Sequence, residues 1–533
     1  RSFAIVLALA VGWSGDALAD DKHSNDADDE LPPAAATQGA PLVSVDLHGR
    51  MRMRGNYFRD ASLGNGTSGV PGSLSTADQN AGIPGLSPSD SLAMGDLRFR
   101  LAPTIHVGSR AAVHAQLDVA GAAMVLGSNP RDESLLQRTV GFSGNGPTRL
   151  GIGVRRLWAD VDLFGMARLQ LGRVGDHFGL GILRNDGGDR RADFQSDIDR
   201  AGVTAELFDF RFRLARDVLG TMPHIPRGPG SQEATVGLLD SGDVIRWLAE
   251  IGGGAATGAG FGWGAAVSYQ SQTSALSLEH DADFTEKIAT GCVENGTCLQ
   301  VEPRDATLIM PQGYVRYERK FGLGLLRAEG ELALMLGTMA NTDSLAATDT
   351  SKTILAGGFA GKLSLQRGTA TWKLLLGAAS GDSEGGFGVL DQHNLTVDKG
   401  GEAVHRTLLT GFRFHRGFLV DGLMFREIIG AVANAWFARP AWRKSLATTG
   451  RLQGAWVEVG CLAGLAFASG ATPGRARLLG VEPDVLVGYD PGAGHSALLH
   501  ATWLLPGGAF DAGEGGAGAS DAWRVTAEWH VEF

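Results

Sequence analysis

The last eleven residues of the chain alternate strictly between apolar and polar side chains. From Trp523 to Phe533 every second residue is apolar, and the residues between them are Arg, Thr, Glu, His and Glu. Successive side chains of a strand point to opposite faces, so this segment predicts a strand with one apolar and one wetted face. The alternative interpretation is an ordinary sandwich strand that happens to end the chain.

The same alternation opens the regular part of the sequence, between Val43 and Tyr57. One face carries Val, Leu, Met and Tyr side chains, and the other carries Arg50, Arg52 and Arg54. If this strand lay in a membrane with the arginines turned outward, each would cost about 2 to 4 kcal/mol near the midplane. We therefore expect the arginines to face the interior of the fold.

The first 41 residues are expected to lie outside the folded domain. An apolar run at 3–12 and the small-residue pattern Ala17-Leu18-Ala19 before Asp20 predict a secretory signal peptide over residues 1–19. Residues 20–41 are acidic, then rich in Pro and Ala, and have no apolar period. This composition predicts a disordered lead.

Residues 42–533 have the same Gly- and Ala-rich composition throughout, which favours a single repeating architecture. With 78 Gly and 20% charged residues, the chain is too apolar for disorder and too evenly mixed for collagen. After the signal, no apolar run is long enough to span a bilayer as a helix. Such a chain crosses a membrane as a closed barrel, because an open sheet edge leaves backbone groups unpaired in lipid. The net charge of -11 argues against nucleic acid as a partner.

Alternating segments recur along the chain, joined in turn by short links and long loops. We count about 18 strands, with 16 as the alternative, because the register is poor in the strand expected at 423–437. The predicted fold is all-β: a transmembrane antiparallel up-and-down β-barrel with long extracellular loops and short periplasmic turns. Six Trp residues on outward faces are expected to form aromatic girdles: Trp247, Trp263, Trp372, Trp503, Trp523 and Trp529.

Several segments resemble a family of porin-like bacterial outer-membrane proteins without an assigned substrate. The clearest are 172–187 and 197–200, and similar segments lie at 97–104, 113–119, 377–382 and 434–440. Trp529 and the closing Phe533 also resemble the last strand of outer-membrane barrels, whose terminal Phe is part of an assembly signal. The resemblance implies a barrel in the bacterial outer membrane, with outer-membrane lipid and the barrel insertion machinery as partners. It carries no catalytic residues and no cofactor.

The polar faces of the first strands supply the side chains that we expect to line a channel. They alternate with apolar residues that would face lipid, so they share one side of the predicted sheet. The predicted pore-lining residues are Arg50, Arg52, Arg54, Arg98, Arg100, His106, His114 and Asp118.

The segment at 175–199 joins the fifth and sixth expected strands, where general porins carry the loop that folds inward to narrow the channel. Its apolar half is expected to pack on the inner wall, and its charged half to oppose the arginines across the lumen. The alternative is an external loop that covers the mouth. The predicted constriction-loop residues are Asp176, His177, Arg184, Asp186, Asp189, Arg190, Arg191 and Asp193.

Two of the three cysteines, Cys292 and Cys298, flank a segment with the turn-forming pair Asn-Gly. In an oxidising compartment they predict a small loop disulfide, with a free pair as the alternative. The acidic residues at 186–199 offer oxygen ligands but lack the spacing of a Ca²⁺ loop, so no metal is assigned. Asp176-His177 and His280-Asp281 come without a Gly-x-Ser-x-Gly motif, which favours solvated loop charges over a barrel hydrolase.

Two functional classes follow from these expectations. The first is a porin-like channel for passive diffusion of small hydrophilic solutes through a charged lumen. The second is a non-conducting barrel for surface display or adhesion through long loops. Barrels of 16 or more strands leave an aqueous path, whereas 8 to 10 leave little room, so the expected strand number favours the channel. The oligomeric state, monomer or trimer, is left open.

Overall fold

The computed structural model describes most of the predicted barrel region. The described residues are 43–61, 63, 91–126, 152–220, 223–224, 235–236, 244–254, 259–280, 292–293, 297–340, 351–383, 396–397, 403–404, 408–420, 422–447, 449–450, 452–492, 494–511 and 518–533. The predicted signal peptide and acidic lead lie outside these residues and stay predictions.

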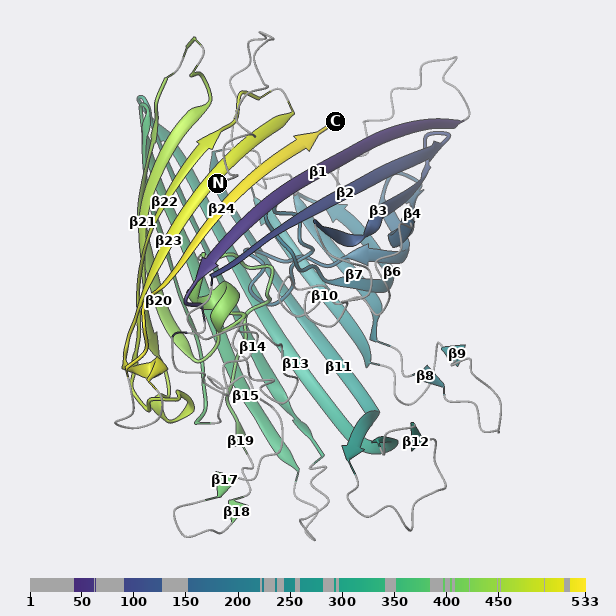
Figure 1. Cartoon of the computed structure of the whole chain (residues 1–533). Coiled ribbons are helices and arrows are strands. Elements are labelled where there is room, and N and C mark those ends of the chain that lie inside the picture. Colours follow the sequence, from purple (N-terminus) through teal and green to yellow (C-terminus); the bar gives the residue numbers. More distant parts are fainter. Residues whose placement is uncertain are drawn as a thin grey trace.

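Twenty strands of the described chain belong to one sheet, drawn in Figure 1, whose pairs are antiparallel except for β15 with β19. Two of them, β12 (Cys292–Val293) and β19 (Leu408–Leu409), are two-residue additions, which leaves eighteen wall strands. The wall strands are β1 (Val43–Arg59), β2 (Ser91–Val107), β3 (Ala111–Leu126), β4 (Ile152–Leu163), β5 (Ala167–Gly175), β6 (Asp197–Leu207), β7 (Phe210–Gly220), β10 (Val244–Gly254), β11 (Gly260–His280), β13 (Thr297–Phe321), β14 (Gly324–Met339), β15 (Lys352–Arg367), β16 (Ala370–Ala379), β20 (Ala435–Ser445), β21 (Ala455–Ala466), β22 (Leu478–Tyr489), β23 (His495–Pro506) and β24 (Ala522–Glu532).

Smaller elements complete the described chain. Two strand pairs lie apart from the main sheet: β8 (Pro223–His224) with β9 (Thr235–Val236), and β17 (Thr396–Val397) with β18 (Ala403–Val404). Three short helices are η3 (Met424–Ile428), η4 (Ser469–Ala471) and η5 (Gly508–Phe510). In the part of the chain that the structure describes, no helix has the length and apolar character needed to cross a membrane.

The sheet closes into a barrel because the first and last strands pair with each other. β1 and β24 are antiparallel, from Arg50 opposite Glu532 to Arg59 opposite Trp523. Two backbone hydrogen bonds between Gly49 and Phe533, of 2.8 and 3.0 Å, end this seam. The all-β fold and the count of 18 strands are thus confirmed. Full closure leaves the wall without the unpaired edges that lipid penalises.

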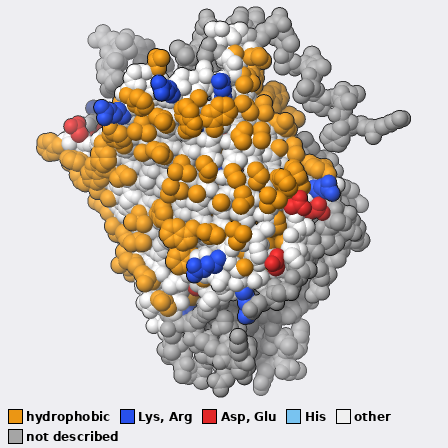
Figure 2. Space-filling view, turned by 90° about the vertical axis from the view of Figure 1, so that its left-hand side faces the viewer, with side chains coloured by type: hydrophobic (Ala, Val, Ile, Leu, Met, Phe, Trp, Pro, Cys, Tyr) orange, Lys and Arg blue, Asp and Glu red, His pale blue; other side chains and the backbone are white. Residues whose placement is uncertain are grey.

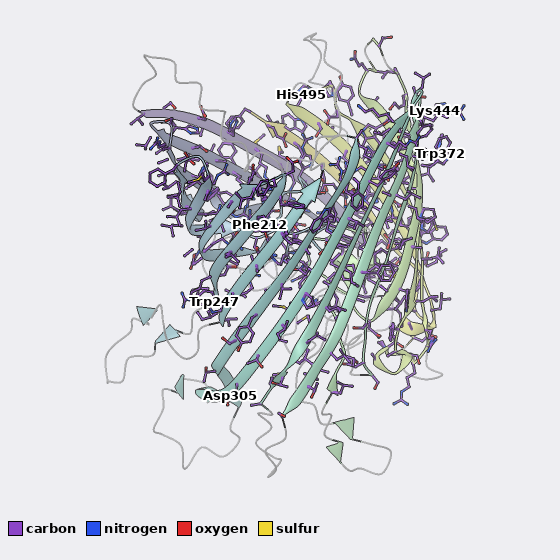
Figure 3. All side chains as sticks on the ribbon, turned by 180° about the vertical axis from the view of Figure 1, so that it is seen from behind. Phe212, Trp247, Asp305, Trp372, Lys444 and His495 are labelled. Atoms are coloured by element: carbon purple, nitrogen blue, oxygen red, sulfur yellow. The ribbon has the colours of Figure 1, made fainter. Side chains whose placement is uncertain are left out.

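The wall has an apolar outer surface. Along β24 the side chains alternate between exposed and buried, with Trp523, Val525 and Trp529 on the exposed side. Figure 2 shows hydrophobic side chains spread over one outer face, with Lys and Arg near its upper and lower borders. Trp247 and Trp372, both about half exposed, project from the outside of the wall in Figure 3. This pattern is typical of a barrel that faces lipid.

The strand predicted at 423–437 is wrong for most of its length. Residues 424–428 form the π-helix η3 inside the barrel, and the wall strand β20 begins only at Ala435. Leu423, Met424, Phe425 and Ile428 are all buried. Because this segment is enclosed on every side, its apolar residues do not follow the two-residue period of a half-exposed strand.

An apolar core lies within the barrel. It consists of side chains from two inward segments, packed on small residues of the wall such as Ala333, Ala356 and Ala360. One segment is the loop at 176–196, between β5 and β6. The other comprises the described residues of 410–434, which precede β20. We call these the first and second inward segments.

Candidate functional site

The first inward segment begins where β5 ends and closes on itself at its base. The N–H of Asp176 donates to the carbonyl of Ser196 at 3.1 Å, and the N–H of Ser196 donates to the carbonyl of Asn185 at 2.7 Å. These bonds turn the chain back toward β6 after it has entered the lumen. The sequence predicted one inward-folding loop for the same residues but did not predict these hydrogen bonds at its base.

Asp176 fixes this base to the wall. Its carboxylate accepts hydrogen bonds from Arg184 at 2.6 Å, from Arg200 of β6 at 3.0 Å and from Arg246 of β10 at 2.7 Å. Burial alone would raise the pKa of Asp176, but the three guanidinium groups hold it well below its usual range. Arg200 and Arg246 also share Asp217 of β7, so the base belongs to a buried ion network.

Asp193 fixes the far side of the loop to β1. Its carboxylate lies 2.7 Å from Arg52 and 2.9 Å from Arg54, and both arginines also bind Asp96 of β2. Burial opposes the charge of Asp193, but Arg54 and Arg52 hold its pKa well below the usual range. The loop charges were predicted to lie across the lumen from the arginines of β1 and β2, and this is wrong for Asp193. Asp193 contacts Arg52 and Arg54 directly, because buried opposite charges are more stable in contact than apart.

Two further predicted pore-lining arginines bind the backbone of the same loop. Arg98 donates to the carbonyl of Ala192 at 2.8 Å, and Arg50 donates to the carbonyls of Gly187 and Gly188, each at 3.4 Å. The arginines of β1 and β2 therefore hold the loop as well as facing the interior. Their role in lining a pore stays a prediction.

The other predicted pore-lining residues pair within the wall. Arg100 of β2 binds Asp118 of β3 through two bonds of 2.6 and 3.0 Å. His114 lies 3.3 Å from Asp160 and stacks on Trp158 with 4.8 Å between ring centroids. His106 lies 3.0 Å from Asp46, near the short turn that joins β2 and β3. None of these four pairings involves the first inward segment.

The loop also reaches the last strands of the barrel. Arg190 lies 2.7 Å from Glu532 of β24, and Arg191 lies 3.6 Å from Glu528 and 3.3 Å from His500. A small depression between the loop and the β1–β24 seam has a mostly charged lining. It is lined by Arg50, Met51, Arg52, Arg98, Arg190, His530 and Glu532.

Three predicted loop residues make local contacts. His177 lies 3.3 Å from Asp186 and bonds to the carbonyl of Gly179 at 3.0 Å. Burial opposes the charge of Asp186, but the hydrogen bond from His177 lowers its pKa to about 2. Asp189 is exposed and accepts the N–H of Arg191 at 2.8 Å. These contacts shape the tip of the loop.

The apolar half of the loop divides between two surfaces. Phe178 packs on Ala215, Leu248 and Ala266 of the wall, as expected. Leu180 and Ile182 instead join the core that contains Phe412, Phe414 and Phe418 of the second inward segment. The contacts of this loop with inward-facing wall residues place it within the barrel rather than over its mouth.

The second inward segment was missed by sequence reasoning. His415 connects it to the loop, because its N–H donates to the carbonyl of Ile182 at 2.7 Å and its ring bonds to Ser196 at 3.0 Å. Arg416 lies over the ring of Phe194 at 3.9 Å. The only signal in the sequence was the poor register at 423–437, interrupted by the charged pair Arg426-Glu427.

The acidic residues at 186–199 bind cationic side chains. Asp197 accepts a bond of 2.6 Å from Arg156, and Asp199 pairs with Arg173 at 2.7 Å on an exposed face. Among the residues described, no cluster of three His, Cys, Asp or Glu is arranged to hold a metal ion. The register places Cys292 opposite Cys298, but their side chains lie outside the described part, so the disulfide stays a prediction.

The predicted assembly residues lie at the seam. Phe533 bonds to Gly49 through its backbone, and its ring stacks on Phe99 with 6.2 Å between centroids. Trp529 is about half exposed on the outer face, opposite Met53 of β1. Their role in assembly stays a prediction.

No protein-family model matches the chain, and no curated protein matches its sequence. Solved structures with a similar fold include three proteins of Pseudomonas aeruginosa. OccK11 (OpdR) is 13% identical, with a TM-score of 0.47 over 92% of this chain and 96% of its own. The outer membrane protein opdK is 13% identical, with a TM-score of 0.46 over 92% and 99%. OpdL is 10% identical, with a TM-score of 0.48 over 92% and 99%. Identities this low leave the solute to be argued from the residues of this chain.

Proposed function

We propose that the chain is a porin-like channel of the bacterial outer membrane that passes small hydrophilic solutes by passive diffusion. The strand number supports this proposal, because barrels of 16 or more strands can enclose an aqueous path and this barrel has eighteen wall strands. Its partners in this proposal are outer-membrane lipid, the barrel insertion machinery and the solutes themselves. No enzymatic activity and no cofactor form part of the proposal.

The observation that carries this proposal is the course of the first inward segment. Residues 176–196 enter the barrel and contact β1, β2, β10 and β24, so they reduce the free cross-section. The depression beside the loop is lined by charged groups, including Arg50, Arg98 and Arg190. A loop held in this way filters by size and by charge, because it fixes charged groups beside the narrowest section.

Single-channel recordings on purified, refolded protein test the proposal. Deleting residues 186–193 removes both bulk and the carboxylate of Asp193, so conductance should rise and ion selectivity should shift toward anions. Replacing Arg50, Arg52 and Arg54 by Gln should reduce anion preference at low salt. The effect should shrink at 1 M salt, where the Debye length is about 3 Å. Unchanged conductance and reversal potential in both folded variants would refute a constriction.

A non-conducting barrel for display or adhesion is the second candidate. One observation favours it: a continuous apolar core within the barrel, built around Phe412, Phe414 and Phe425, reduces the space for water. In that case the folded wild-type protein would show no conductance, and deletion of 186–193 would not produce any. The recordings described above therefore separate the two functions.

A further inference from the structure

The turn that leads into η3 lies on one buried carboxylate of the wall, that of Glu482 on β22. The N–H groups of Gly422 and Leu423 donate to its Oε1 at 3.0 and 3.1 Å. The N–H of Met424 donates to its Oε2 at 2.8 Å. Both oxygens of a side chain that is only 1% exposed are thus used by a single turn of the second inward segment.

These three donors have no alternative acceptor within the helix. The first N–H groups of a helical turn lack intrahelical partners, and a negative charge at that end is favourable. The neighbouring side chains of Leu423, Leu462 and Leu504 are apolar and fully buried. Without the carboxylate, these donors would lose their acceptor inside the barrel, which destabilises the present position of the turn.

The opposite side of the turn is held by Arg524 of β24. Its guanidinium donates to the carbonyl of Gly422 and lies 2.8 Å from the carboxylate of Glu427. A further bond of 3.0 Å connects it to Asn56 of β1. The turn is therefore held between an acceptor on β22 and a donor on β24. In Figure 1 the short green helix lies beside the lower ends of β1 and β24.

Close packing at Gly422 leaves the turn little freedom while it is in place. A Cβ at this position would overlap the hydroxyl of Thr502 on β23 and would lie 2.9 Å from His500. The backbone of the turn thus lies directly against the inner wall. Gly422 itself adds no side chain to the apolar core, whereas Leu423 and Met424, the next two residues, do.

We propose that Glu482 is the positioning residue of the second inward segment and thereby sets the free cross-section of the lumen. The inference rests on the proposed channel function. Glu482 acts through the backbone it holds: with its carboxylate present, residues 422–428 stay against β22 to β24. Without it, the segment leaves the wall and the lumen changes shape.

The test compares three variants of the full chain: Glu482→Leu, Glu482→Gln and the control Glu458→Gln. Glu458 is equally buried on the neighbouring strand β21, but its partners are wall residues, Lys373 at 3.2 Å and Arg443 at 2.9 Å. The control removes the same charge without touching the turn. The readouts are single-channel conductance and hydrogen exchange of the amides at 422–424.

We expect these amides to exchange at least tenfold faster in Glu482→Leu than in the wild type, and conductance to change by at least half. Glu482→Gln keeps one acceptor oxygen and should show a smaller effect on both readouts. Glu458→Gln should keep wild-type exchange at 422–424. If the amides at 422–424 exchange at the wild-type rate in both Glu482 variants, the inference is overturned. If Glu482→Leu does not fold, the exchange rate in Glu482→Gln alone decides the test.

A reversible lock adds a rescue experiment. A Cβ at residue 422 would lie 3.1 Å from the Cβ of Thr502, shorter than the spacing of about 3.5 to 4.5 Å in disulfides, so the bond forms once the turn moves outward by a few tenths of an ångström. Gly422→Cys with Thr502→Cys, added to Glu482→Leu, should restore wild-type conductance when oxidised and lose it on reduction. Glu482→Leu alone, reduced in parallel, controls for the other cysteines. An oxidised lock without any effect on conductance would overturn the inference.

The two readouts also separate this inference from the proposed function. A folded wild type without conductance overturns the channel, and with it the claim about the cross-section. Faster amide exchange in Glu482→Leu would then still show that Glu482 positions the segment. A conducting wild type with unchanged exchange in the variants overturns the inference alone.

Discussion

The carboxylate of Asp193 lies 2.6 Å from the guanidinium of Arg426, although 233 residues separate them in the chain. Asp193 belongs to the first inward segment and Arg426 to the second. The same carboxylate binds Arg52 and Arg54 of β1. One carboxylate therefore joins both inward segments to the wall.

Replacing Asp193 by Asn should loosen both inward segments without unfolding the barrel. Removing one partner of a buried ion pair costs about 3 to 5 kcal/mol, because the remaining charges are left uncompensated. Three arginines would lose their shared acceptor, so we expect higher conductance and a reversal potential shifted toward anion preference. The matched control is Asp189→Asn, since Asp189 is exposed and bonds only within its own turn among the contacts described. Equal reversal potentials for the two variants would contradict the prediction.

The turn of the second inward segment at His415 should weaken in acid. Burial lowers the pKa of this imidazole to about 4, so it is neutral at pH 7. Its Nδ1 accepts the N–H of Gly417 at 2.9 Å, a bond that protonation abolishes. Because the folded pKa lies below the unfolded value of about 6.5, the stabilisation is complete above pH 6.5. It is lost progressively as the pH falls toward 4.

Conductance recorded from pH 7 to pH 4 measures this loss. Asp176, His177, Asp186 and Arg416 are the charged neighbours of His415, and they are present in the variant as well. His415→Gln removes only the imidazole, so its profile should be flatter than that of the wild type between pH 6.5 and pH 4. Parallel profiles for the two proteins would show that His415 is not responsible.

Closing the seam should depend on the fit between Gly49 and Phe533. A Cβ at Gly49 would overlap the ring of Phe533, so Gly49→Val should lower the yield of folded barrel, as should deletion of Phe533. The yield is measured as the heat-modifiable fraction in outer membranes. Gly55→Val is the control on the same strand, because a Cβ there meets nothing within 4 Å. Equal yields for both Gly variants would argue against the fit.

The predicted bond between Cys292 and Cys298 should stabilise its loop locally. A ring this short contributes about 2 to 3 kcal/mol at most, so reduction should leave the barrel folded. Mass spectrometry after alkylation, with and without reduction, measures the state of both thiols. Modification of both cysteines in unreduced outer membranes would exclude the disulfide.

The wall could be predicted from the sequence because each strand has two different environments. β1 and β24 carry exposed, mostly apolar side chains on the outer side and buried, mostly polar side chains on the inner side, which produces the period of two at Val43 to Tyr57 and Trp523 to Phe533. Met424 and Phe425 have no such asymmetry, since they are enclosed on all sides. Their segment therefore resembled an irregular strand.

The contacts of the first inward segment could be predicted only in part. Its composition showed an apolar half and a charged half, and its place between β5 and β6 suggested an inward course. The partners of Asp193 could not be found, because Arg52 and Arg54 precede it by about 140 residues and Arg426 follows it by 233. Closure of the barrel brings these four residues together. Local sequence patterns do not predict which distant residues closure brings into contact.

The first inward segment binds both strands of the seam, through Asp193 to Arg54 of β1 and through Arg190 to Glu532 of β24. The loop can make both contacts only after the last strand has come to lie beside the first. The two contacts are therefore complete only in the closed barrel. There the loop acts as an internal latch that ties the first strand to the last.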